Sequence, residues 1–380
     1  MENVSRPQHS SSSSPSQSSA RRSLRPYLDM YGDFITKNAG AVSQIESALR
    51  SLTYIVPARF KDVELASESL HSGIQLLSLY HDSLLARAVA QLPSLNREKP
   101  TPHNRYTKFW TEKSPSYRRL ALLVTMIQYT ELLWEMTAKR RGEKMRWHVV
   151  IVLELAKAIC RLLLLRLTNS RPLLTPPLPE REIDPASLDE CSETESPPPE
   201  PATWKMPRTG LELSGLPNSG RISQYLLSKV LTAEDVKPPA QLLHRIRGSG
   251  YLAEVLYILR PVVYAIAMKR FANDRKSWTP WLLGFSLEYA ARQMTKRDLE
   301  ASIPGGLRGL TQLERDELTR RAWAMGWWTV RGAFYENLTG PFLKSISSRL
   351  SGQPVLGLLG GVLEDYQYLW DNYYFSSATL

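Results

Sequence analysis

The chain has 380 residues, 43% of them hydrophobic, which is enough to bury the core of one large or two ordinary domains. Its formal net charge of +11 predicts a negatively charged partner, either nucleic acid or an anionic lipid surface. Two cysteines, Cys160 and Cys191, exclude a disulfide framework and a multi-cysteine metal site.

Motifs of known catalytic sites are absent from the sequence. It contains no HExxH metal site, GxSxG elbow, Walker loop or GxGxxG phosphate cradle, and its six histidines are scattered. No histidine has an aspartate at the spacing of an acyltransferase charge-relay pair. We therefore expect a binding protein that is not an enzyme, with no catalytic residue, cofactor or metal.

The first 26 residues are rich in serine and arginine and lack an apolar core. They do not match a secretory signal, and no amphipathic face accompanies the arginines as it would in a transit peptide. We expect residues 1–26 to form a disordered basic tail on a chain that is not secreted.

Residues 27–170 carry one helical pattern after another and form the expected N-terminal half. Apolar residues recur at spacings of three and four over 45–56 and again over 70–92, where His81 interrupts the stripe. We interpret His81 as a hydrogen-bonded core histidine. Residues 120–136 are apolar on more than one face, so this helix must be buried in protein or lipid.

Residues 147–167 are the most apolar segment, yet they carry charges. Glu154, Lys157 and Arg161 near the middle would each cost about 2.5–3.5 kcal/mol to insert, whereas about a dozen apolar residues return about 0.3–0.6 kcal/mol each. The three charges fall on one narrow stripe of the helix. This stripe is expected to face a partner helix or, if the helix lies in the interface, the lipid headgroups.

Residues 171–247 differ in composition, because they hold half of the chain's 26 prolines and a cluster of acidic residues. This composition is typical of a disordered linker, and we predict a linker over the whole segment.

Residues 248–376 form the expected C-terminal half. Its apolar segment, 251–268, contains Glu254, Arg260 and a helix-kinking Pro261. Thr279 followed by Pro280 predicts a helix start, and Thr311 with Glu314 predicts a capping box.

Cationic residues flank both apolar segments and favour lipid over nucleic acid as the anionic partner. We predict contact with lipid headgroups for the following residues: Lys139, Arg140, Arg141, Lys144, Arg146, Trp147, Lys269 and Arg270. The alternative is a soluble bundle in which these charges are solvated.

Two motifs resemble the peroxin sixteen family: AEVLYILRP at 253–261 and SWTPWLL at 277–283. The resemblance continues through 310–321, the tyrosine-rich end and much of the first half, and the long serine-rich tail is similar to fungal members. The motif residues expected to matter are Glu254, Arg260, Pro261, Trp278, Pro280 and Trp281.

The helical patterns predict an all-α fold, a multi-helix membrane-associated bundle. The resemblance implies that it lies at the peroxisomal membrane, reached in some lineages through the endoplasmic reticulum. It also implies a peroxisome biogenesis factor that recruits the third peroxin and supports membrane-protein insertion with the nineteenth. In some fungi the family is linked instead to control of peroxisome division. A soluble nucleic-acid adaptor is the remaining alternative, although no groove-reading or stacking motif supports it.

Overall fold

The computed structural model describes residues 30–32, 34–35, 39–55, 63–91, 100–182, 204–205, 212–213, 235–274, 276–350 and 357–378. The regular structure in these ranges is almost entirely helical, which confirms the expected all-α fold class. The predicted tail over 1–26 and Cys191 lie outside the described residues.

The main helices are α2 (Ala39–Ile55), α3 (Val63–Gln91), α4 (Pro102–Lys113), α5 (Pro115–Arg140), α6 (Glu143–Leu167), α9 (Ser249–Arg270), α10 (Trp278–Ser302), α11 (Gln312–Ala324), α13 (Gly340–Leu350) and α14 (Gly357–Asn372). Shorter elements are the 3₁₀ turns η4 (Pro239–Leu242), η5 (Gly306–Gly309), η6 (Met325–Val330) and η8 (Phe375–Ser377), the α-turn α12 (Gly332–Phe334) and the π-helical turn η7 (Tyr335–Thr339). The two-residue strands β1 (Trp204–Lys205) and β2 (Glu212–Leu213) pair antiparallel.

Polar caps fix several helix starts. The Ser114 side chain accepts a hydrogen bond from the Tyr117 amide and precedes a proline at the first turn of α5. The capping box predicted at Thr311 and Glu314 is confirmed at the start of α11. The predicted Thr279 cap is wrong, because Ser277 precedes α10 and Pro280 lies inside its first turn. A proline is tolerated there because first-turn amides have no intrahelical acceptor.

The chain divides into two compact units, of which the first comprises residues 1–49, 77–97 and 183–198. Its described core contains Ile35, Val42, Leu84 and Leu85. His81 is fully buried, with ring nitrogens 3.1 Å from Glu46 Oε1 and 2.8 Å from Tyr31 Oη, which confirms that it is a hydrogen-bonded core histidine.

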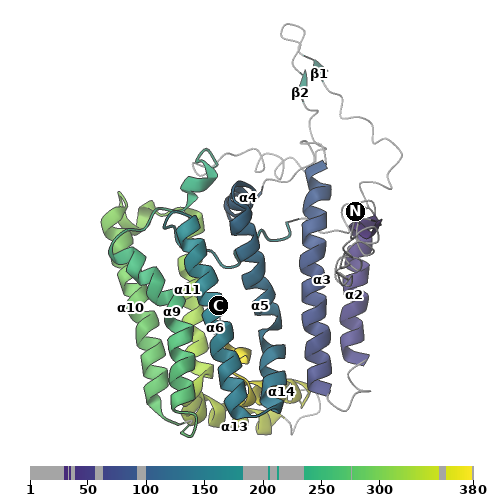
Figure 1. The fold of residues 1–380 in the computed structure, drawn as a ribbon, viewed down its shortest axis with the longest axis vertical. Coiled ribbons are helices and arrows are strands. Elements are labelled where there is room, and N and C mark those ends of the chain that lie inside the picture. Colours follow the sequence, from purple (N-terminus) through teal and green to yellow (C-terminus); the bar gives the residue numbers. More distant parts are fainter. Residues whose placement is uncertain are drawn as a thin grey trace, which may run out of the picture. The chain divides into compact units, whose positions relative to one another are not determined.

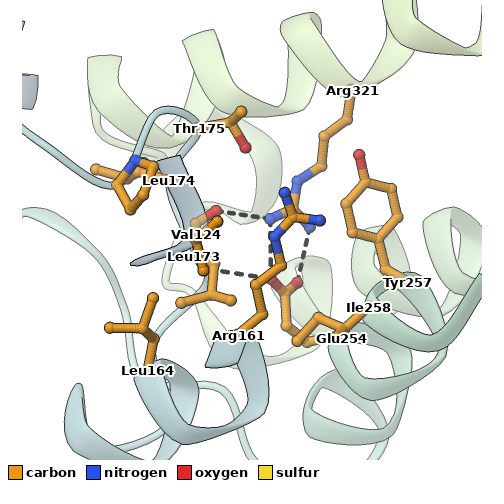
Figure 2. A pocket seen from close by; sticks show the side chains of 11 residues that line it. Val124, Arg161, Leu164, Leu173, Leu174, Thr175, Glu254, Tyr257, Ile258 and Arg321 are labelled. Carbon is orange, nitrogen blue, oxygen red and sulfur yellow. Dashed lines mark hydrogen bonds and ion pairs between the residues drawn. The ribbon is translucent and has the colours of Figure 1, made fainter. Parts of the chain in front are cut away.

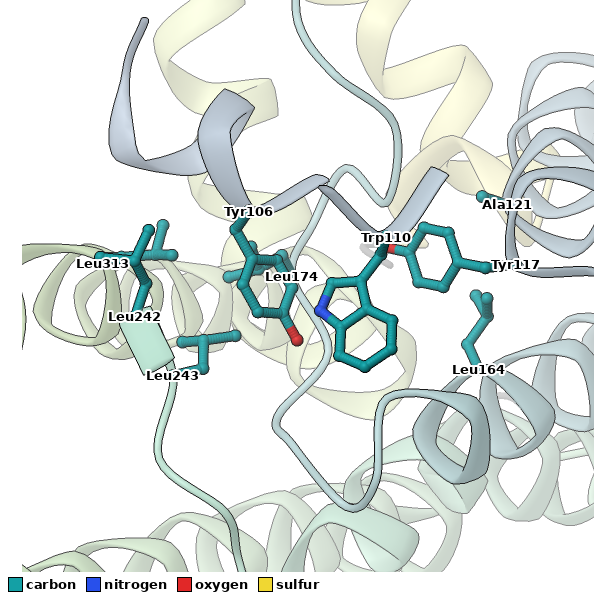
Figure 3. Packing of buried hydrophobic residues seen from close by; sticks show 9 residues of the cluster. All are labelled: Tyr106, Trp110, Tyr117, Ala121, Leu164, Leu174, Leu242, Leu243 and Leu313. Atoms are coloured by element: carbon teal, nitrogen blue, oxygen red, sulfur yellow. The ribbon is translucent and has the colours of Figure 1, made fainter. Parts of the chain in front are cut away.

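The second unit comprises residues 50–76, 98–182 and 199–380 and contains an aromatic core around Trp110. Trp110 of α4 lies between the rings of Tyr106 and Tyr117, and leucines from four other segments surround it (Figure 3). We call this set the Trp110 core; its buried members are Tyr106, Trp110, Tyr117, Ala121, Leu164, Leu174, Leu242, Leu243 and Leu313.

Both ends of the predicted linker belong to this folded unit, so the prediction of a linker over the whole of 171–247 is wrong for 171–182 and 235–247. Leu174, Leu242 and Leu243 are buried in the Trp110 core. The Tyr117 hydroxyl donates to the Pro177 carbonyl at 3.1 Å. The prolines predict an irregular backbone, but a segment with an irregular backbone can still pack into a core through its apolar side chains.

Four long helices of the second unit, α5, α6, α9 and α10, pack in chain order, each against the next (Figure 1). The α5–α6 turn and the α9–α10 turn lie at the same end, since Lys269 Nζ of α9 is 3.3 Å from His148 Nε2 near the start of α6. Helix α9 runs through Pro261 without interruption.

Candidate functional site: charged residues inside, apolar residues outside

Helix α6 buries its charged stripe. Glu154, Lys157 and Arg161, which lie at spacings of three and four, are all buried, and Lys157 is only 1% exposed. The Lys157 ammonium is 2.7 Å from Glu131 Oε2 of α5 and 3.2 Å from Glu154 Oε1. The polar stripe therefore faces partner helices of this chain, one of the two arrangements expected from the sequence.

The opposite face of α6 is apolar and exposed. Val152, Leu155, Ile159 and Leu163 recur every three or four residues, and Val152 is 63% exposed. A helix of a water-soluble protein places its apolar stripe inside and its charges outside. In α6 this arrangement is inverted.

The three neighbouring helices repeat the inversion. Each buries at least one carboxylate, among them Glu135 of α5, Glu254 of α9 and Glu288 of α10. The exposed large apolar residues of these helices are Leu123, Met126 and Trp134 of α5, Tyr251, Leu252 and Ile266 of α9, and Trp278, Leu282, Leu283 and Tyr289 of α10. Together with the exposed stripe of α6 they form what we call the apolar outer face.

The buried carboxylates are paired with cations. Arg146 Nε lies 2.8 Å from Glu135 Oε1, and Arg260 Nη1 lies 2.6 Å from Glu288 Oε2. Breaking such a pair by removing one partner strands a buried charge, which costs about 3–5 kcal/mol. The pairs therefore favour the packing of α5 against α6 and of α9 against α10.

The best-connected pair joins α9 to α11 (Figure 2). Arg321 donates from Nη1 and Nη2 to the two oxygens of Glu254 at 2.7 and 2.9 Å, and its Nε reaches Glu317 at 2.9 Å. Glu254 also accepts the Leu173 amide at 3.0 Å. Burial alone would lower the pKa of Arg321, but the facing carboxylates raise it above its ordinary value, so the guanidinium stays charged.

Arg161 lies beside this pair at a small cavity of about 20 Å³, which can hold a single water molecule (Figure 2). No described residue forms a hydrogen bond or ion pair with its guanidinium. The cavity is too small for a substrate, and we interpret it as part of the structural charge network.

The end of the chain closes the polar interior on the side of α5. The amides of Tyr374 and Phe375 donate to the two oxygens of Glu135 at 2.7 and 2.9 Å. The Lys157 ammonium lies 4.9 Å from the centre of the Phe375 ring. The tyrosine-rich end thus supplies backbone donors that these buried charges require.

The residues predicted to contact lipid fall into two groups. Arg140, Arg141 and Lys144 at the α5–α6 turn, and Lys269 and Arg270 at the end of α9, are exposed. The structure brings these five residues to one end of the second unit.

The other three predicted lipid-contact residues are engaged with the protein. Arg146 is buried against Glu135, and Trp147 packs in a core with Tyr374. Lys139 donates to the carbonyl and side-chain oxygens of Asn372. For Arg146 and Trp147 the prediction of headgroup contact is wrong, because the helix they begin turns its charged face inward.

The family-motif residues gather around α9 and α10. Glu254 and Arg260 make the ion pairs described above, and the Pro261 carbonyl accepts the Tyr374 hydroxyl at 3.3 Å. Trp281 Nε1 donates to the Trp328 carbonyl at 2.8 Å.

The remaining motif residues lie at the start of α10. Pro280 is buried, whereas Trp278 is partly exposed and packs edge-on against Trp281 and Phe334. These are structural roles, in that the motif residues hold α9 and α10 against the C-terminal segments.

Several partners in the network were not predicted from the sequence: Glu131, Glu135, Glu288 and Arg321. The sequence contained a signal for two of them, because Glu131 and Glu135 lie one helical turn apart in an otherwise apolar helix. Within the described ranges, no group of three or more His, Cys, Asp or Glu side chains could hold a metal ion.

Comparison with known proteins identifies the family. Residues 29–372 match the family described as Peroxisomal membrane protein (Pex16). The chain belongs to the Pex16 family. This confirms the family expected from the two motifs and the location at the peroxisomal membrane.

Three curated relatives agree with this membership. The Peroxisomal membrane protein PEX16 of Schizosaccharomyces pombe is 22% identical over 359 residues, covering 91% of this chain and 97% of the relative. The Peroxisome biogenesis protein 16 of Arabidopsis thaliana is 21% identical over 364 residues, covering 87% and 94%. The Peroxisome biogenesis factor 16 of Dictyostelium discoideum is 28% identical over 130 residues, about a third of each chain. These names support the expected role in peroxisome biogenesis. No solved structure matches the chain.

Proposed function

We propose that this Pex16-family chain is a membrane-held recruitment factor that acts by binding and not by catalysis. The observation that carries the proposal is the inversion of α5, α6, α9 and α10, which bury paired charges and expose apolar side chains. Exposing such a surface to water costs free energy, whereas exposing it to the acyl region of a bilayer does not.

The apolar outer face is proposed to contact lipid. Among the described helices, α9 is long and apolar enough to cross a membrane, and 44% of its most apolar stretch is buried inside the protein. The exposed apolar stripe of α6 extends this apolar surface beyond α9.

The basic turns are proposed to contact anionic headgroups. Arg141, Lys144, Lys269 and Arg270 are exposed at the end where the α5–α6 and α9–α10 turns meet. Each basic residue near an anionic leaflet contributes about 1 kcal/mol.

The proposed partners are other peroxins, the third as the recruited membrane protein and the nineteenth as the soluble carrier. These partners, and a route through the endoplasmic reticulum, follow from the resemblance to the family and are proposals for this chain.

The test combines fractionation with deletion. A tagged chain should stay with peroxisomal membranes through moderate salt and alkaline carbonate, and its deletion should deplete peroxisomal membrane proteins. Release by these washes would contradict tight membrane association. Normal membrane-protein content with altered peroxisome number would instead favour control of division.

A further inference from the structure

A second cavity lies at the end of the second unit that carries the α5–α6 turn. It has a volume of about 230 Å³ and is lined by Glu64, Leu65, Met136, Lys139, Arg140, Tyr368 and Tyr373. We call it the Glu64 pocket. Pockets for drug-sized molecules span about 300–1,000 Å³, so this one fits a smaller group, yet it exceeds the space needed for a few water molecules.

One wall of the pocket is anionic. The hydroxyls of Tyr368 and Tyr373 each donate to Glu64 Oε2 at 3.2 Å, which holds the carboxylate in place. Burial and the neighbouring Glu64 carboxylate raise the pKa of Tyr373, so its hydroxyl stays protonated and remains a donor. No described residue forms a hydrogen bond with Glu64 Oε1, which leaves one acceptor of a fixed carboxylate for a ligand.

The lining also contains two cations. The Lys139 ammonium is anchored by Asn372 and lies 4.5 Å from the centre of the Tyr373 ring. Arg140, the next residue of α5, is exposed and also lines the pocket. An ammonium and a guanidinium that line one pocket can each donate to a phosphate oxygen.

The carboxylate and the two cations together select a zwitterion that carries a phosphate and an amine. A quaternary choline has no N–H to donate to Glu64, and the Tyr373 face that could hold it by cation–π attraction already faces Lys139. A serine headgroup would bring a second carboxylate toward Glu64. A primary ammonium beside a phosphate, as in phosphoethanolamine, satisfies both the carboxylate and the cations.

We propose that the Glu64 pocket binds the phosphoethanolamine headgroup of phosphatidylethanolamine. The lipid source rests on the membrane association proposed above and on position, because Arg140 continues directly into the exposed basic turn of Arg141 and Lys144. The pocket would then distinguish one type of headgroup from another, whereas the basic turns would respond only to negative charge.

The test uses short-chain lipids below their micelle concentration, so that it does not depend on membrane partition. The purified full chain in detergent is titrated calorimetrically with dihexanoyl-phosphatidylethanolamine, with the choline and serine analogues, and with glycerophosphoethanolamine, which lacks acyl chains. We expect the ethanolamine lipid to bind saturably and at least about ten-fold more tightly than the other three probes. This ratio corresponds to the free energy of one hydrogen bond to an ionised group.

Variants separate selectivity from affinity. Glu64→Gln keeps an acceptor for the tyrosines but removes the charge, and should abolish the preference for ethanolamine over choline. Arg140→Gln should weaken all three lipids by a similar factor. Glu112→Gln, an exposed glutamate of α4, is the matched control and should change nothing.

Equal binding of the three headgroups, no binding, or an unchanged preference in Glu64→Gln would overturn the proposal. Equally tight binding of glycerophosphoethanolamine would overturn the lipid source and assign the pocket to a soluble ester. None of these results bears on the carbonate test, so the failure of the pocket and the failure of membrane association can be told apart.

Discussion

The Trp110 core and the helices α5, α6, α9 and α10 belong to one unit but are built by opposite rules. In the Trp110 core, aromatic and leucine side chains are buried as in any water-soluble protein (Figure 3). In α6, the charges of the stripe from Glu154 to Arg161 lie inside, and the opposite stripe of apolar side chains lies outside. The proposed membrane contact accounts for the difference, because the apolar outer face would meet lipid whereas the Trp110 core follows the rule for proteins in water.

The two regions also rely on different forces. Burial of apolar area stabilises the Trp110 core at about 25 cal/mol per Å². Side chains of the apolar outer face gain nothing from this term in water, and the helices behind them are held together by buried paired charges as well as buried apolar side chains.

Removing one member of a buried ion pair should have the largest effect. Glu254→Leu leaves the Arg321 guanidinium and the Leu173 amide without their acceptor, and we expect a loss of about 3–5 kcal/mol in the free energy of unfolding in detergent. The double variant with Arg321→Leu should cost less than the sum of the two single variants. Additive costs in this cycle would mean that the pair contributes no coupling.

Truncation should affect the two regions differently. Trp110→Ala empties a packed core and should cost about 3–5 kcal/mol in the same unfolding assay. Leu155→Ala on the apolar outer face should cost about 0.5 kcal/mol or less, because the side chain is exposed. Comparable losses at both sites would show that Leu155 is covered by protein.

Charge removal at the basic turns should act on membrane binding and leave folding unchanged. Replacing Arg141, Lys144, Lys269 and Arg270 by glutamine should weaken binding to vesicles with anionic lipid by about 1 kcal/mol per residue, with less effect at high salt. Flotation at two salt concentrations measures it. Unaltered flotation of the quadruple variant would contradict headgroup contact by these residues.

A further predicted effect depends on pH and concerns Glu68 of α3. Burial raises its pKa to about 7, although the Ser72 hydroxyl donates to it. The folded state therefore holds this proton more tightly than the unfolded state, so stability falls as the pH rises from about 4.5 to 7. Glu68→Gln should raise the melting temperature at pH 8 and change it little at pH 4. A shift of equal size at both values would exclude this titration as the cause.

Periodicity predicted the helical class and the capping box at Thr311, because these depend on neighbours in the chain. The charged stripe of α6 was also visible, but its partners were not. Glu131 meets Lys157 of this stripe, and Glu254 meets Arg321, through tertiary packing that no local pattern encodes. The ends of the predicted linker were misjudged because proline content reports irregular backbone and not whether Leu174 or Leu242 finds a core.

Whether the apolar outer face meets lipid can be tested directly from the surroundings of a spin label at Leu155. A spin label is placed there in a chain whose Cys160 and Cys191 are replaced by serine, and a second label at Glu112 serves as the control. In vesicles, we predict that the label at Leu155 collides more with oxygen than with a water-soluble nickel complex, and that the label at Glu112 shows the reverse. Preferential collision with nickel at Leu155 would place this face in water and contradict the account.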